Sequence, residues 1–322
     1  MDEITIATML ASTLRVATPL ILCALAGTLS ERAGVIDLGL EGKMLMTAFA
    51  TASVGVASGS LFMALAAAIA VGVALSLLHG YACVSHGGDQ VVLGMAITMT
   101  AAGLTVVLGI AWFNQGGQTP PLPDGVRLGT LWPGAVTAVQ DWPYVGAILG
   151  IGLLGHNVMV YASWLLVAAV WWLLYRTRFG LRLRATGENP AMVDAAGVSV
   201  LWMRYQALML NGALAALSGA YLVLALTPAF IPNMTAGRGY MALAAMIFGK
   251  WHPVGALLAC LLFGFLEAAA IRLQGVIIPG LGAVPVQAIQ ALPYVMTVVL
   301  LAGFIGRAYA PKALGLPYVK ER

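Results

Sequence analysis

The sequence predicts an all-α protein: a polytopic bundle of about nine transmembrane helices, some broken or re-entrant, in a single domain covering residues 1–322. Composition is the first reason, because 61% of the 322 residues are hydrophobic and only 9% are charged, whereas a soluble domain carries about 25% charged residues. The second is that the apolar residues form stretches of the roughly 20 residues needed to cross about 30 Å of hydrocarbon. The third is that these stretches are continuous, without the alternation of barrel strands.

The hydrophobic stretches place the crossings in order along the chain. A mildly amphipathic stretch at 2–14 precedes the first crossing, and three glycines in the second favour a broken helix there. A connection rich in Pro and Gly, residues 114–157, separates the fourth crossing from the fifth. The seventh is short, which predicts that the seventh and eighth form a partly re-entrant pair. The expected crossings are 16–34, 35–57, 61–84, 91–113, 158–175, 205–227, 238–250, 253–272 and 284–303.

The basic residues predict the orientation. If the loop at 176–204 is cytoplasmic, twelve of the sixteen Lys and Arg residues lie on the inner side. The positive-inside rule therefore predicts a multi-pass protein of the inner (plasma) membrane, with the C-terminus cytoplasmic and the N-terminus and the 114–157 connection extracytoplasmic. The same clustering accounts for the net charge of +4, so we expect no nucleic acid as a partner.

The sequence lacks the residues that an enzyme would need. Neither Gly-Lys pair, at 42–43 and 249–250, is followed by Ser or Thr, so the chain has no GxxxxGK[ST] phosphate loop. The four histidines have no metal-ligand spacing, and the three cysteines lie far apart in apolar stretches. We therefore expect no catalytic residue, no metal and no cofactor, and ATP hydrolysis would have to come from a partner subunit.

The loop at 176–204 is an island of polarity between two crossings. Its Gly187-Glu188-Asn189-Pro190 run predicts a turn and a helix start, since Pro is favoured at the first helical position. Residues 191–196 would form a short helix with Gly197 as its C-cap. Such a helix, held at the membrane surface by two crossings, could transmit force to a partner. An ordinary positive-inside loop is the alternative.

Three ordered motifs resemble one family. Residues 183–198, LRATGENPAMVDAAGV, resemble the coupling-helix loop of ABC importer permeases of the ribose and branched-chain amino acid type, nucleoside permeases above all. Met192 and Val193 replace that family's small-residue pair. Residues 30–44 resemble the nucleoside-type GVxNIGLEGxM segment, with Asp37 where that subgroup often has Asn. Residues 237–251 resemble its GxG[FY]xALAAMIFGxW segment.

This resemblance implies the permease subunit of an ATP-driven importer, which conducts a small polar solute, in the first place a nucleoside, by alternating access. It also implies an ATP-binding subunit, a second and non-identical permease subunit in preference to a homodimer, and an extracytoplasmic solute-binding protein that the 114–157 connection could contact. Membrane lipid is a further partner. The residues implied in coupling to the ATPase are Arg184, Gly187, Glu188, Asn189, Pro190, Asp194 and Gly197.

Polar residues near or within the crossings are candidates for the pathway or its gate, because isolated charges in a membrane are costly and often functional. Asp37 and Glu41 lie four residues apart and would share one helix face, or else meet water or pair with nearby basic residues. Glu267 could instead pair with Arg272. Inter-helix hydrogen bonding would account for Asn211 as well, and snorkelling for Arg238. The complete set is Asp37, Glu41, Asn211, Arg238, Tyr240 and Glu267.

Three other functions stay open on the residues alone. A ribose-like simple-sugar importer permease is the alternative within the same class. A stand-alone, ion-coupled secondary transporter and an intramembrane enzyme are the alternatives from other classes. Transport assays separate them, because only an importer permease would depend on a partner ATPase.

Overall fold

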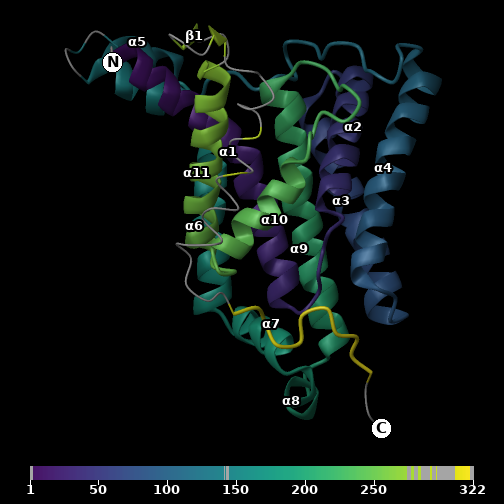
Figure 1. Cartoon of the computed structure of the whole chain (residues 1–322). Coiled ribbons are helices and arrows are strands. Elements are labelled where there is room, and N and C mark those ends of the chain that lie inside the picture. The colour runs from purple at the N-terminus through teal and green to yellow at the C-terminus, as the bar shows by residue number, and fades with distance from the viewer. Residues whose placement is uncertain are drawn as a thin grey trace.

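The computed structural model describes residues 3–140, 142, 145–273, 277–278, 282–283, 291, 295 and 309–319. They form a bundle of helices (Figure 1). The strands found among them are the two-residue β1 (Ile277–Ile278) and β2 (Gly282–Ala283), which pair antiparallel. The predicted all-α class is therefore confirmed.

Six helical segments of the described residues are long and apolar enough to cross a membrane. They are α1 (Glu3–Arg32), α3 with η1 (Leu61–Gly80 and Tyr81–Ser85), α4 (Gln90–Phe113), α6 (Val158–Arg176), α9 with η3 (Val200–Tyr221 and Leu222–Leu226) and α11 (Pro253–Leu273). The chain is thus a multi-pass membrane protein, but the nine predicted crossings are not confirmed. The ninth, at 284–303, falls almost entirely outside the described residues.

Two further helices of the bundle are not among these six. α2 (Leu40–Ser58) has a polar first turn, with Glu41 and Lys43, which lowers its hydropathy. α10 (Arg238–Phe248) has 11 residues, or about 16 Å at 1.5 Å per residue, roughly half of the hydrocarbon thickness. Figure 1 shows α10 in the middle of the bundle, between α9 and α11. α10 is therefore a half-helix, and the seventh predicted crossing is not confirmed.

α1 begins earlier than the sequence suggested. It runs for 30 residues through Pro19, so the stretch at 2–14 is not a separate amphipathic segment. Ala7 and Ala11 are buried in this first part. A Cβ on Gly264 of α11 would lie 2.8 Å from the carbonyl oxygen of Thr13, so the two helices approach closely. Tertiary packing therefore extends the helix.

α1 and α9 form the centre of the bundle. Their most apolar windows are 72% and 78% buried, whereas those of α3 and α4 are 22% and 17% buried. α3 and α9 touch at Gly72 and Gly212, where a Cβ on either residue would lie 2.4 Å from the carbonyl oxygen of the other. Such close backbone approach is how helices associate in lipid. α3 and α4 leave a broad apolar face uncovered in the single chain.

The 114–157 connection is partly helical and docked on the bundle. It contains α5 (Pro133–Gln140) and η2 (Ile148–Leu154). The Leu122 amide donates to the Pro228 carbonyl at 2.7 Å, and the Leu128 amide donates to the Leu224 carbonyl at 2.9 Å. Because these bonds tie it to the segment after α9, the connection covers one end of the bundle.

α7 (Arg178–Glu188) and α8 (Pro190–Ala195) lie at the other end of the bundle. Figure 1 shows residues 309–319 running beside them, with the C-terminus at this end and the N-terminus at the opposite one. The sequence predicted α8 but missed α7.

Candidate functional site

The chain between α1 and α2 is irregular inside the bundle. Residues 33–39 leave the helix, with Gly34 at φ 87°. The side-chain oxygen of Gln90 accepts from the Ile36 amide at 2.7 Å, and the Asp37 carboxylate accepts from the Gly39 amide at 3.1 Å. We call residues 33–39 the α1–α2 break. Side chains satisfy the amides that the lost helix leaves unpaired, as irregular backbone at membrane depth requires.

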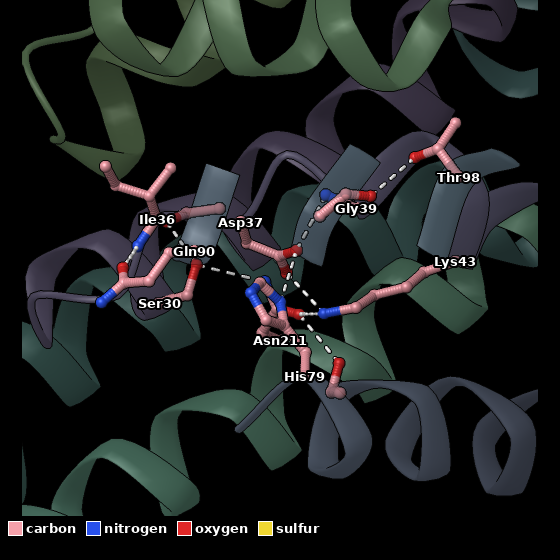
Figure 2. Close-up of polar contacts among 12 residues, drawn as sticks. Ser30, Ile36, Asp37, Gly39, Lys43, His79, Gln90, Thr98 and Asn211 are labelled. Atoms are coloured by element: carbon pink, nitrogen blue, oxygen red, sulfur yellow. Dashed lines mark hydrogen bonds and ion pairs between the residues drawn. The ribbon is translucent and has the colours of Figure 1, made fainter. Parts of the chain in front are cut away.

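Asp37 is the centre of a buried polar network (Figure 2). Its carboxylate lies 2.5 Å from the Lys43 ammonium and 3.2 Å from Nδ1 of His79, and all three side chains are fully buried. Lys43 also donates to Oδ1 of Asn211 at 3.1 Å. We call Asp37, Lys43, His79 and Asn211 the Asp37 network. A buried charge at this depth is tolerable because it is paired and hydrogen-bonded.

Asn211 connects this network to the central helices. The Ser76 hydroxyl donates to its Oδ1 at 3.1 Å, and its Nδ2 donates to the Ala26 carbonyl at 2.9 Å and to the Ser30 hydroxyl at 3.3 Å. The network thus joins α1, the α1–α2 break, α2, α3 and α9. Relative movement of any of these elements would break a hydrogen bond in apolar surroundings.

The expectation that Asp37 and Glu41 share one helix face is wrong. α2 begins at Leu40, so Asp37 lies in the break, before the helix. The Glu41 carboxylate instead accepts from the amides of Gly237 and Gly239, at 2.8 and 2.6 Å. These amides open α10, whose N-cap, Gly237, has no capping side chain. Glu41 supplies the missing acceptor at the positive end of the helix dipole.

Glu267 pairs with Arg238 and not with Arg272. Nη2 of Arg238 lies 2.9 Å from Oε1 of Glu267, and both side chains are largely buried. Arg272 donates to the hydroxyl of Thr8. Five residues on a helix turn through about 140°, so Glu267 and Arg272 face different neighbours. The side chain of Tyr240, two residues after Arg238, is 44% exposed.

A cavity of about 270 Å³ lies between α2, α3 and α4, beside the Asp37 network. Its walls are mostly aliphatic, with His79 and Thr100 as the polar exceptions. The residues around it are Met46, Leu75, Leu78, His79, Ala82, Leu93, Ala96, Ile97, Thr100, Ala101 and Leu104.

The polar segment between α6 and α9 forms two helices, α7 and α8, which are joined at Asn189. The Asn189 side chain accepts from the Met192 amide at 3.2 Å and caps α8, with Pro190 at its start. Gly197 follows α8 at φ 78°. The predicted short helix is therefore present with Pro190 at its start, but its C-cap is Ala196, and Gly197 lies one residue beyond the cap.

An apolar groove of about 550 Å³ runs between α7 and α8. We call it the α7–α8 groove. Two of its apolar side chains, Leu181 and Met192, are 62% and 70% exposed. The residues around it are Leu181, Arg182, Ala185, Glu188, Asn189, Met192, Val193, Ala196 and Val198.

Of the other expected coupling residues, Asp194 and Gly197 line a neighbouring pocket of about 280 Å³ together with Tyr318. Arg184 is not among the groove residues, because its guanidinium lies 4.7 Å from the ring centroid of Tyr175 on α6. The structure thus divides the motif between two faces of the α7–α8 segment.

α7 is fastened to the α1–α2 break by backbone contacts. A Cβ on Gly187 would lie 2.3 Å from the carbonyl oxygen of Arg32, the last residue of α1, and 3.3 Å from the Gly34 nitrogen in the break, so only glycine allows this approach. The Ala313 amide donates to the Gly187 carbonyl at 2.8 Å, and the Gly315 amide donates to the Gly34 carbonyl at 3.1 Å. The C-terminal segment therefore clamps α7 to the break that carries Asp37.

Sequence reasoning singled out Asp37 and Asn211, and its alternative that Asp37 pairs with a nearby basic residue is confirmed by Lys43. It gave no role in the site to His79. His79 lies 42 residues from Asp37, and no spacing rule connects the two. A lone histidine inside an apolar stretch was the one available signal.

Comparison with known proteins agrees with this architecture. Residues 9–304 match the family described as "Branched-chain amino acid transport system / permease component". The guanosine ABC transporter permease protein NupQ of Bacillus subtilis is 37% identical over 97% of this chain and 96% of that protein. The nucleoside ABC transporter permease protein NupC of Lactococcus lactis is 35% identical over 99% and 98%.

A more distant relative is the ribose import permease protein RbsC of Escherichia coli, 27% identical over 72% of this chain and 68% of that protein. The family match and the two full-length relatives leave one assignment: the chain belongs to the branched-chain amino acid transport system permease component family.

Proposed function

We propose that this chain is the permease subunit of an ATP-driven importer and conducts a nucleoside into the cytoplasm by alternating access. The observation that carries the proposal is the contact of α7 with the α1–α2 break, because it links an exposed docking groove to a buried charged network. The names of the two full-length relatives favour nucleosides as cargo.

In this proposal the α7–α8 groove receives the ATP-binding subunit. Exposed apolar side chains framed by Arg182 and Glu188 are typical of a protein interface. Asn189, Pro190 and Gly197 fix the shape of the helical lever, and Asp194 lies beside it. Gly187 passes the movement to the break, and Arg184 holds α7 against α6.

The transport pathway would use the polar groups in the middle of the bundle. The Asp37 network would act as the gate, since two arrangements of the break would favour different states of the permease. The Arg238–Glu267 pair offers a largely buried polar surface whose Arg238 Nε and Glu267 Oε2 lack hydrogen-bond partners among the described residues. Glu41 would couple α2 to α10, and Tyr240 would extend the polar surface.

The remaining partners follow from the two ends and one face of the bundle. With the α7–α8 end in the cytoplasm, the C-terminus is cytoplasmic and the N-terminus is outside, in agreement with the positive-inside count. The docked 114–157 connection then offers a surface to a solute-binding protein. The uncovered apolar face of α3 and α4 would meet a second permease subunit, in the first place a non-identical one.

Reconstitution into liposomes tests this proposal. The chain is combined with its ATPase, second permease and binding protein, and uptake of labelled guanosine, other nucleosides and ribose is measured with and without ATP. We expect ATP-dependent nucleoside uptake. Uptake of ribose alone would favour the sugar importer, and gradient-driven uptake by the chain alone would contradict the proposal.

A further inference from the structure

The corner between α6, α7 and the turn before α11 holds a strip of stacked cations and rings. The Arg176 guanidinium lies 5.8 Å from the ring centroid of Trp171, whose ring is 6.4 Å from that of Tyr175. The Arg184 guanidinium lies 4.7 Å from the Tyr175 centroid, and the His252 ring lies 5.0 Å from it. We call these five residues the cation–aromatic strip.

Among the described residues, no carboxylate pairs with either guanidinium group of the strip. The ion pairs of the described residues involve Lys43, His79 and Arg238, so Arg176 and Arg184 are without a carboxylate partner there. A guanidinium stacked on a ring keeps its in-plane N–H donors for other acceptors, and their fork geometry suits phosphate.

The other members of the strip add no negative charge. Burial, together with the charge of Arg32, lowers the pKa of His252, which keeps this imidazole neutral at neutral pH. Trp171 and Tyr175 provide flat surfaces on which the cations are held. The strip therefore presents fixed positive charge on an aromatic support.

The position of the strip identifies the source of its ligand. Arg176 is the last residue of α6, and the same helix exposes Trp164, Leu165 and Trp172, as a lipid-facing helix does. Aromatic and basic side chains at the end of a span lie at headgroup level. Arg184 is outside the α7–α8 groove, and its Nε is buried without a hydrogen-bond partner among the described residues.

We propose that the cation–aromatic strip binds the phosphate of an anionic phospholipid headgroup. Two arginines without a carboxylate partner among the described residues, held on an aromatic support at the end of a span, fit this ligand, since basic side chains beside the membrane surface attract anionic headgroups. The lipid would bridge α6 and α7, and so attach the base of the lever to the membrane.

Native mass spectrometry of the full-length chain tests the proposal. The wild type is incubated with phosphatidylglycerol or phosphatidylcholine of identical acyl chains, and the retained lipid is counted. We expect the wild type to retain more phosphatidylglycerol than phosphatidylcholine. In R176Q/R184Q the ratio of the two retained lipids should fall by about fivefold for each arginine removed. R178Q removes an exposed arginine two residues after Arg176 and should retain the preference, which makes it the matched control.

Equal retention of the two lipids by the wild type would overturn the proposal, as would an unchanged preference in R176Q/R184Q or an equal loss in R178Q. In a parallel arm, thermal unfolding is measured with inorganic phosphate and with phosphatidylglycerol. An equal rise in the unfolding temperature with both would show a site for soluble anions instead. Thermal unfolding in phosphatidylcholine checks that each variant is folded. Arg176 is exposed, so R176Q alone gives the readout if the double variant does not fold.

Discussion

At the scale of single residues, the most informative feature is the burial of Asp37 with its partners. Desolvating a carboxylate and an ammonium is costly, and their mutual attraction offsets that cost only when the geometry is good and the remaining hydrogen bonds are made. The Asp37 carboxylate meets both conditions, because Lys43 and His79 reach it and Asn211 holds Lys43, while Nε2 of His79 is buried without a hydrogen-bond partner among the described residues. The pair is therefore stable together but costly to separate.

Removing one partner of this pair should cost more than removing both. We expect Lys43→Met to lower the free energy of unfolding by about 3–5 kcal/mol, because it leaves the Asp37 carboxylate buried with less compensation. The double variant Asp37→Asn/Lys43→Met should recover part of that loss. Thermal unfolding in one detergent measures both. Lys250→Met, at an exposed lysine, is the control, and a double variant less stable than Lys43→Met would contradict the account.

At the scale of elements, the half-helix α10 depends on a cap from another helix. A half-helix that begins inside the bundle has no water to satisfy its first amides. Glu41 satisfies two of them from α2, so the positions of α2 and α10 are linked. The same carboxylate was predicted as a pathway residue, and its observed contacts give it a structural role that a movement of α2 would transmit to α10.

Glu41→Gln should loosen the start of α10. The amide side chain keeps one acceptor oxygen and loses the negative charge, so one of the two amides, at Gly237 or Gly239, loses its bond, at about 1–2 kcal/mol. Hydrogen exchange of the first turn of α10 should become faster, while exchange in α6 stays the same. Glu3→Gln, at an exposed position of α1, is the matched control. Unchanged exchange in α10 would refute the capping role.

At the scale of the whole molecule, the helical bundle has a candidate partner surface at each end, and contacts through its centre join them. The α7–α8 groove lies at one end and the docked 114–157 connection lies at the other. Between them, Gly187 contacts the α1–α2 break, and the break carries Asp37. A movement at the groove therefore has a continuous path of backbone contacts and hydrogen bonds to the Asp37 network.

The sequence predicted the parts of this path that depend on local rules. Hydrophobic length predicted the membrane class, and Pro190 with Gly197 predicted α8, because both residues have fixed positions at helix ends. α7 was missed although Thr177 is a suitable N-cap, since the arginines of 178–184 suggested a positive-inside loop.

The long-range pairs could not be predicted from a single sequence. Arg238 with Glu267, Glu41 with the amides of α10, and Asp37 with His79 are set by how helices pack. Spacing within one helix instead suggested that Glu267 pairs with Arg272 and that Asp37 and Glu41 share one helix face. Both suggestions failed, the first because five residues do not share a face and the second because the helix starts after Asp37.

The central claim is that α7 and α8 are mechanically linked to the α1–α2 break. Measuring transport by Gly187→Ala tests this claim most directly. A Cβ there would lie 2.3 Å from the Arg32 carbonyl oxygen and would force α7 away from α1. Gly125→Ala, where a Cβ meets nothing within 4 Å, is the control. In reconstituted importer, we predict that Gly187→Ala still binds the ATPase and hydrolyses ATP but loses most nucleoside uptake. If Gly187→Ala takes up as much nucleoside per ATP hydrolysed as the wild type does, the account is contradicted.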